Sequence, residues 1–369
     1  MDGVMDSVRD GRSEISSAWQ LQFPPLQPHD GGWLDVGEGH QLHWTCSGHP
    51  GAPAVLFVHG GPGAGCTSDD RRWFDPQRWR IVQFDQRGAG LSRAEDLLHA
   101  NTTPHLLADM EALRIHLGIG RWALFGGSWG ATLALAYAQQ HAQQVSGLVL
   151  RGVFTATRAE ACWLYGTRGA AACHPAAWQR LCAAAGAETG TRLLDAMHIR
   201  LQGHDQPAVA AAQAWWQWEH ALMDSEADSE ADSKKNIETD SETDNKTTGP
   251  AVPCRTLPDS VALAQARIGV HYARHHWFLA DGQLLAQAGA LHGLPGFIVQ
   301  GQRDRITPPA AARALHAVWP QALWHGVPAA GHASSHPGIA RHLIAATESL
   351  ASRISHLAPT NPTQETHHG

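Results

Sequence analysis

The stretch Phe125-Gly126-Gly127-Ser128-Trp129-Gly130 joins two segments of different character. Residues 121–125, which lead into it, are short, apolar and aromatic, as expected of a buried parallel strand. Residues 131–138, which follow it, are rich in helix formers. This pattern predicts a strained turn that presents the Ser128 hydroxyl at the carboxyl end of a strand, beside the positive end of a helix. By itself the stretch favours an ordinary glycine-rich turn, so its interpretation depends on the rest of the chain.

Composition narrows the class of protein. The net charge of −7 and the lack of a Lys/Arg block exclude a generally basic nucleic-acid binder. No apolar run reaches membrane-spanning length, and residues 1–20 lack the charged start and apolar centre of a secretory signal. The six cysteines have no regular spacing, which in a reducing compartment indicates free thiols. We therefore expect a cytoplasmic protein that binds neither nucleic acid nor membrane, and the oligomeric state stays open.

Alternation of strand-like and helix-like segments predicts an α/β fold with a mostly parallel, doubly wound sheet. After residue 154 the pattern becomes mostly helical and rich in Ala, Trp and His, which predicts a helical cap inserted into the core. Within it, residues near 224–249 are too polar to offset their ordering entropy, so a disordered acidic insertion is expected. The expected order is a disordered tail at 1–20, core at 21–154, cap at 155–290, core at 291–357 and a disordered tail at 358–369.

A second glycine-rich turn, His59-Gly60-Gly61-Pro62-Gly63, follows the apolar strand expected at 54–58. Glycines at a strand end expose backbone N–H groups, and acyl transfer needs such groups aimed at a developing oxyanion. With Ser128 as nucleophile, the two donors of an oxyanion hole would be Trp129 and Gly61. The segment by itself is equally compatible with a structural turn. A phosphate loop is disfavoured, because no Gly-Lys-Ser/Thr follows.

The next expected strand, at 80–85, closes with Asp85 and leads into Gln86-Arg87. We expect Asp85 and Arg87 to brace this loop as an ion pair. They are not expected to take part in catalysis.

Two further residues complete a possible catalytic triad with Ser128. Asp304 follows the strand expected at 296–300, and His332 follows the one expected around 322–324. Each residue alone has an ordinary structural explanation. An Asp after a strand usually caps the following turn, and any one of the 25 histidines is usually a surface residue. Together they give the order nucleophile, acid, histidine, each at the carboxyl end of a strand. Ser128 would attack a carbonyl, His332 would carry the proton and Asp304 would hold the imidazole, with no metal or other cofactor required.

The combined motifs closely resemble the proline iminopeptidases (prolyl aminopeptidases), serine peptidases of the α/β-hydrolase fold. The resemblance spans roughly residues 22–350. Besides the turns and the triad already described, it includes the segments 32–36, 84–88, 101–103, 150–154, 215–219 and 266–268. It implies an α/β-hydrolase core with a helical cap, and release of N-terminal proline from short peptides through an acyl-enzyme.

An exopeptidase must bind the free amino group of its substrate, which is largely cationic at neutral pH. A buried carboxylate can do so, and it excludes internal peptide bonds because they would leave its charge unpaired. The resemblance assigns this role to Glu219, which ends a tryptophan-rich segment with Trp218 beside it. The alternative is that Glu219 is an ordinary solvent-exposed glutamate on a helix. The family has a second glutamate where this chain has Gly269, so amine binding or substrate preference is expected to differ here.

Three functions stay open at this level. The first is the prolyl aminopeptidase, carried by the triad and Glu219. The second is a related amidase, esterase or aminopeptidase with relaxed specificity, suggested by Gly269. The third is a non-catalytic binding protein on the same scaffold.

Overall fold

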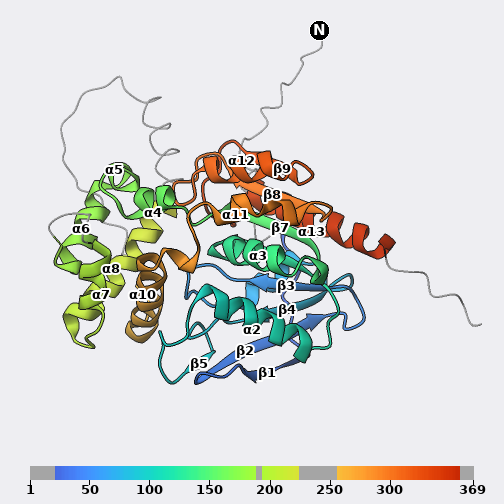
Figure 1. The fold of residues 1–369 in the computed structure, drawn as a ribbon, viewed down its shortest axis with the longest axis horizontal. Helices are drawn as coiled ribbons and strands as arrows, with labels where there is room; N and C mark the ends of the chain where they lie inside the picture. The colour runs from blue at the N-terminus through green and yellow to red at the C-terminus, as the bar shows by residue number, and fades with distance from the viewer. Residues whose placement is uncertain (1–20, 188–192, 224–255, 358–369) are drawn as a thin grey trace, which may run out of the picture.

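The computed structural model describes residues 21–187, 193–223 and 256–357. In this part of the chain nine strands form one sheet (Figure 1). In spatial order they are β1 (Asp30–Asp35), β2 (His40–Gly48), β4 (Arg80–Phe84), β3 (Ala54–Val58), β6 (Trp122–Ser128), β7 (Val145–Val153), β8 (Gly296–Gly301) and β9 (Leu323–Val327), while the short β5 (Arg93–Ala94) pairs with β2.

The sheet is parallel from β4 through β9 and antiparallel at β1 and β2. Central parallel strands are covered on both faces, and the five residues of β3 are accordingly all apolar and buried. Parallel strands bring their carboxyl ends to one edge of the sheet. The segments that leave β3, β6, β8 and β9 therefore meet at that edge, although they lie far apart in the sequence.

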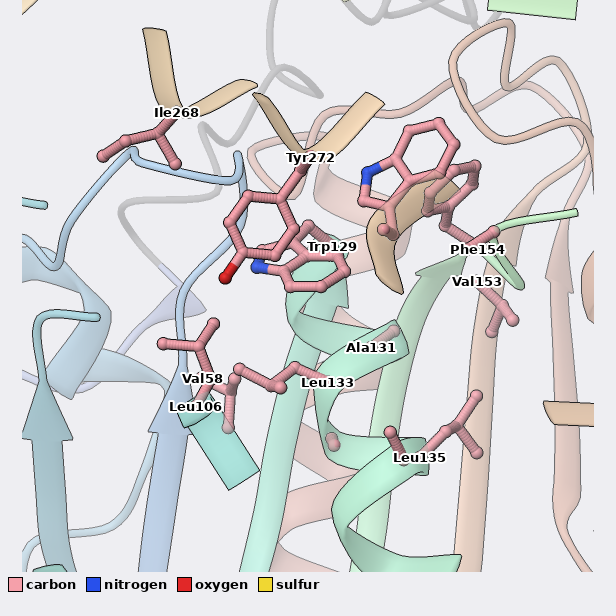
Figure 2. Packing of buried hydrophobic residues seen from close by; sticks show 14 of the residues in the cluster. Val58, Leu106, Trp129, Ala131, Leu133, Leu135, Val153, Phe154, Ile268 and Tyr272 are labelled. Carbon is pink, nitrogen blue, oxygen red and sulfur yellow. The ribbon is translucent and has the colours of Figure 1, made fainter. Parts of the chain in front are cut away.

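Two apolar clusters cover the two faces of the sheet. Side chains alternate along a strand, so Leu56 and Val58 join one cluster while Val55 and Phe57 join the other. The first cluster includes the helices α2 (Thr103–His116), α3 (Trp129–Gln140) and α12 (Pro309–Val318), and the second includes η1 (Ser68–Trp73) and α13 (Pro337–Leu357). Figure 2 shows part of the first cluster, where Leu133 on α3 lies near Val58 and Leu106.

Helices make up most of the described chain between β7 and β8, where the sequence predicts a cap, and the first six of them form a group to one side of the sheet (Figure 1). They are α4 (Arg158–Tyr165), α5 (Ala170–Cys173), α6 (Pro175–Ala185), α7 (Leu193–Arg200), α8 (Gln206–Met223) and α10 (Asp259–Arg274), followed by the short η4 (His276–Phe278), α11 (Gln283–Ala286) and η5 (Ala288–Leu291). Helix α8 packs against α6 and α10. The boundaries of the cap stay predictions. The predicted tails at 1–20 and 358–369 and the acidic insertion near 224–249 lie outside the described residues.

Two findings concern the whole described chain. None of its helices combines the length and the apolar character that crossing a membrane requires. The five cysteines that it contains are all free thiols.

Candidate active site

The strained turn predicted from the sequence is present at Ser128. This residue ends β6 and directly precedes α3, with φ 58° and ψ −126°. The turn leaves no room for side chains around it, because a Cβ at Gly126 would lie 2.3 Å from the Gly130 carbonyl oxygen. A Cβ at Gly130 would lie 2.1 Å from the carbonyl oxygen of Val58. The glycines on both sides of Ser128 therefore allow the strand, the helix and β3 to approach one another closely.

Asp304 and His332 form a buried pair at the same edge of the sheet. Asp304 follows β8, His332 follows β9, and each is no more than 5% exposed. The His332 Nδ1 lies 2.8 Å from the Asp304 Oδ2. Because a carboxylate can only accept, Nδ1 carries the proton and Nε2 is left as the basic nitrogen.

Five donors point at the Asp304 carboxylate. Oδ1 accepts from the backbone N–H groups of Ile306 and Thr307, at 2.9 and 2.8 Å. Oδ2 accepts from the Thr307 hydroxyl at 2.8 Å and from the Gln300 amide at 3.2 Å, in addition to the His332 imidazole. Burial by itself raises the pKa of Asp304, but the His332 charge and these hydrogen bonds outweigh it and hold the pKa below its usual value. Asp304 is therefore ionised at neutral pH.

A cavity of about 370 Å³ opens at this edge, within the size range of small-ligand sites. Six of the seven site residues predicted from the sequence line it, namely Gly61, Ser128, Trp129, Trp218, Glu219 and His332. The seventh, Asp304, contacts His332 without lining the cavity. The remaining wall is largely apolar and aromatic, with Phe154, Leu164, Tyr165 and Trp277 among its members.

The loop after β3 brings Gly61 to this cavity. Gly61 has φ 115°, a conformation that L side chains rarely adopt, and a Cβ there would lie 2.6 Å from the Gly63 backbone nitrogen. Only glycine fits this position without rearrangement of the loop. Gly61 and Trp129 thus lie on the same cavity as Ser128, as the proposed oxyanion donors must.

Glu219 is the one carboxylate that lines the cavity within the described residues. It lies on α8, and burial raises its pKa to about 7, although a hydrogen bond from the Trp215 indole acts in the opposite direction. Its charge also affects the cavity wall, because burial and then the charge of Glu219 raise the pKa of Tyr165 well above its usual value. An incoming cation would relieve the cost of holding this carboxylate in an apolar wall.

The space beside Gly269 is taken up by Trp215. Gly269 lies on α10, and a Cβ there would be 3.0 Å from the Trp215 Nε1. The Trp215 ring is also stacked on Tyr165, with centroids 5.0 Å apart and an interplanar angle of 17°. The Cβ of a glutamate at position 269 would therefore press against this indole, which would have to shift by a few tenths of an ångström and is the ring that hydrogen-bonds Glu219.

The sequence assigned no role to Arg151, yet this residue lines the cavity. Its Nη1 donates to the backbone oxygen of His332 at 2.8 Å, and its guanidinium lies against Gly127, where a Cβ would be 2.5 Å from Nη2. Arg151 thereby connects the turn at Ser128 with the loop that carries His332. A charged residue inside the largely apolar strand β7 was the signal that could have revealed it.

The predicted ion pair between Asp85 and Arg87 is wrong. Arg87 instead makes a bidentate pair with Asp109 of α2, with two N–O distances of 2.7 Å. Asp85 accepts the backbone N–H groups of Cys66 and Leu91, at 2.7 and 2.8 Å. A buried guanidinium is best satisfied by a carboxylate that accepts two parallel N–H bonds from it, and Asp109 on α2 is such a carboxylate.

Comparisons with solved structures confirm the fold. An alpha/beta fold family hydrolase from Bacillus anthracis superposes with a TM-score of 0.54 at 14% identity, covering 87% of this chain and 99% of that one. An alpha/beta hydrolase enzyme from a Medee basin deep-sea metagenome library gives 0.53 at 14% identity, covering 90% and 100%. The sequence model of the alpha/beta hydrolase fold family matches residues 53–338. These matches agree with the predicted α/β-hydrolase core.

Sequence comparison finds closer relatives, among them three proteins named proline iminopeptidase. The protein from Arabidopsis thaliana is 40% identical over 348 residues, which are 94% of this chain and 86% of that protein. The protein from Xylella fastidiosa (strain Temecula1) is 41% identical over 334 residues, covering 89% and 98%. The protein from Neisseria gonorrhoeae is 38% identical over 331 residues, with coverage of 89% and 98%. With this similarity over nearly its whole length, the chain belongs to the proline iminopeptidases of the alpha/beta hydrolase fold.

Proposed function

We propose that this chain is a serine exopeptidase, a prolyl aminopeptidase that releases N-terminal proline from short peptides. Three observations support the proposal: the relatives at 37–41% identity, the His332–Asp304 pair, and the cavity that Ser128 and His332 share. In the reaction, the Ser128 Oγ attacks the prolyl carbonyl carbon while the His332 Nε2 takes its proton.

The tetrahedral intermediate places a negative charge on the former carbonyl oxygen, and the backbone N–H groups of Gly61 and Trp129 stabilise it. His332 then returns the proton to the leaving amine, and the C–N bond breaks. A water molecule, deprotonated by His332, attacks the prolyl ester on Ser128; the bond to the Ser128 Oγ breaks, His332 returns the proton to this oxygen, and proline is released. Asp304 keeps the His332 proton on Nδ1 throughout both steps.

The observation that carries the exopeptidase assignment is the Glu219 carboxylate in the wall of the same cavity as Ser128. A free N-terminal ammonium pairs with this carboxylate, whereas a blocked or internal proline would leave it buried and unpaired. The apolar wall accommodates the pyrrolidine ring, and Trp218 lies next to Glu219 as an aromatic surface for the cationic amine.

Selectivity for a free amine is the first expected result. Proline naphthylamide should be cleaved with a kcat/KM roughly 100-fold higher than acetyl-proline naphthylamide, since an unpaired buried charge costs several kcal/mol. Alanine naphthylamide and a simple acyl ester, measured alongside, test the alternative of a relaxed amidase or esterase. Equal rates on the free and acetylated substrates would refute the exopeptidase assignment, and equal rates on proline and the acyl ester would favour the alternative.

The pH dependence of amine binding provides a second test, through Glu219→Gln. Glu219 becomes protonated as the pH falls through about 7, so at pH 5 the wild type and the variant both present a neutral group. As the pH rises, the wild-type carboxylate ionises and pairs with the substrate ammonium. The ratio of wild-type to variant kcat/KM for proline naphthylamide should therefore increase between pH 5 and pH 8, reaching roughly 10- to 100-fold.

Taking this ratio cancels every pH effect that the two proteins share. Acetyl-proline naphthylamide is the matched control: it carries no ammonium, so its ratio should not rise with pH and should instead fall, because only the wild type must then hold an unpaired charge. A ratio for proline naphthylamide that is constant from pH 5 to pH 8 would show that Glu219 does not bind the amine.

We also propose a cytoplasmic location. The support is the free state of Cys46, Cys66, Cys162, Cys173 and Cys182, which is typical of a reducing compartment.

A further inference from the structure

Gln86 connects the two backbone segments that carry the proposed oxyanion donors. It follows β4 and is 2% exposed. Its side-chain oxygen accepts from the Trp129 indole Nε1 at 2.8 Å, and its side-chain nitrogen donates to the His59 carbonyl oxygen at 2.9 Å. The orientation of the amide is fixed, because an indole N–H can only donate and a carbonyl can only accept. One amide group thus bridges the first residue of α3 and the segment that leads to Gly61.

A third hydrogen bond fixes His59 in the same network. The Gln86 backbone N–H donates to the His59 Nε2 at 3.0 Å, so this nitrogen is an acceptor. The proton is then on Nδ1, which lies 2.8 Å from the Gly60 carbonyl oxygen and donates to it. Burial lowers the pKa of His59, which agrees with a neutral ring. Gln86 therefore hydrogen-bonds both the ring and the carbonyl oxygen of His59. His59 in turn hydrogen-bonds the Gly60 carbonyl, which belongs to the peptide that precedes Gly61.

The other partner of Gln86 has little freedom of its own. The Trp129 side chain is fully buried, and Tyr272 of α10 packs edge-on against it with ring centroids 5.1 Å apart. Figure 2 shows the two rings together at the start of α3. The indole N–H needs an acceptor in this buried position, and Gln86 supplies it.

We propose that Gln86 is a positioning residue for the oxyanion hole: it sets the distance between the Gly61 and Trp129 N–H groups through its bridge between His59 and the Trp129 indole. This inference rests on the proposed function. Gln86 does not line the cavity, so it acts through the two segments that it joins and does not touch the substrate.

The effect should fall on the transition state. An oxyanion hole stabilises a charge that is absent from the bound substrate, so misplaced donors lower kcat and leave KM nearly unchanged. Removing a donor outright costs about 10²- to 10³-fold in kcat, and a displacement of about 1 Å can cost roughly 10²-fold. Loss of the Gln86 bridge, which displaces the donors without removing either, should therefore cost roughly 10- to 100-fold.

The test compares Gln86→Leu with Gln83→Leu. Gln83 lies on β4, is also 2% exposed, and makes one side-chain hydrogen bond, to the Thr67 carbonyl at 2.9 Å. Both changes remove a buried glutamine side chain, but only Gln86 contacts the segments of the oxyanion hole. We expect Gln86→Leu to lower kcat on proline naphthylamide roughly 10- to 100-fold with KM within about twofold, and Gln83→Leu to change kcat less than about threefold.

A transition-state analogue separates positioning from general structural damage. The boronic acid analogue of proline forms a tetrahedral adduct with Ser128 that places an oxygen in the oxyanion hole. Its affinity should fall in Gln86→Leu by the same factor as kcat. The proposal is overturned if kcat is unchanged, if KM rises as much as kcat falls, or if Gln83→Leu has the same effect.

A second variant covers the case in which Gln86→Leu does not fold. Trp129→Phe removes the indole N–H but keeps the backbone N–H, so it should give the same loss of kcat at unchanged KM. Where both variants fold, their losses should not add, because each breaks the same bridge. The wild-type rates on free and acetylated proline substrates are unaffected by these outcomes, so a failure here leaves the proposed function standing.

Discussion

Replacing Ser128 by alanine should lower kcat on proline naphthylamide roughly 10⁶-fold, the size of effect that follows loss of a serine nucleophile. The reason is chemical, because no acyl-enzyme can form without the Oγ. The fold should survive, since alanine has the same Cβ and the turn with φ 58° is enforced by the glycines around it. Binding of proline should therefore be unchanged, and a small residual rate should remain from the oxyanion hole and the bound geometry.

Ser334 provides the matched control for this result. It is one of two further serines in the wall of the same cavity, and it does not lie on the strand-to-helix turn. Ser334→Ala should keep most of the activity, and a fluorophosphonate probe should label the wild type and Ser334→Ala but not Ser128→Ala. Labelling that persists in Ser128→Ala would show that Ser128 is not the nucleophile. So would a loss of activity in Ser334→Ala as large as the loss in Ser128→Ala. A wild type that neither reacts with the probe nor cleaves any substrate would support the non-catalytic binding protein.

The turn at Ser128 could be predicted because its physical requirement is local. A strand that passes directly into a helix needs glycines wherever another backbone comes within contact distance, and these glycines are visible in the sequence. The convergence of Ser128, Asp304 and His332 could be predicted for a different reason. Parallel strands share one edge, so three residues at or shortly after the carboxyl ends of such strands are brought to the same edge by the topology.

The partners of buried charges could not be predicted in the same way. Asp85 and Arg87 are two residues apart, and their proximity in sequence suggested a pair that the structure does not contain. The actual partner of Arg87 lies 22 residues away, on the helix that covers the sheet. Which carboxylate meets a buried guanidinium depends on how the helix packs on the sheet, and the local sequence does not encode that geometry.

The neighbourhood of Gly269 shows a similar limit. The sequence indicated an absent carboxylate, but it did not show that the Trp215 indole lies in the freed space. The proposed amine site thus consists of Glu219 with its indole donor from Trp215, one turn earlier on the same helix. Helical spacing made that contact foreseeable, whereas the packing of α10 against α8 did not follow from the sequence.

Asp304→Asn should lower kcat roughly 10⁴-fold, the loss that follows when the orienting acid of a triad becomes an amide. All five groups that face Asp304 act as donors to it, so an asparagine NH₂ finds an acceptor only at the Oδ2 position, and only if a partner there changes its role. If the asparagine oxygen keeps the two backbone N–H groups, its NH₂ faces His332 and donates to Nδ1. The imidazole proton then moves to Nε2, and His332 can no longer accept the proton of Ser128.

Thr307→Val is the control for the Asp304 variant, because it deletes one of the five donors and keeps the shape of the side chain. The carboxylate still accepts from the His332 Nδ1, so the tautomer and most of the rate should be retained, with a loss of no more than about tenfold. Measurement of kcat, with thermal unfolding to verify the fold, compares the two. If Asp304→Asn were no slower than Thr307→Val, neither the Asp304 charge nor the His332 tautomer that it fixes would take part in the reaction. The carboxylate would then only support the loop after β8.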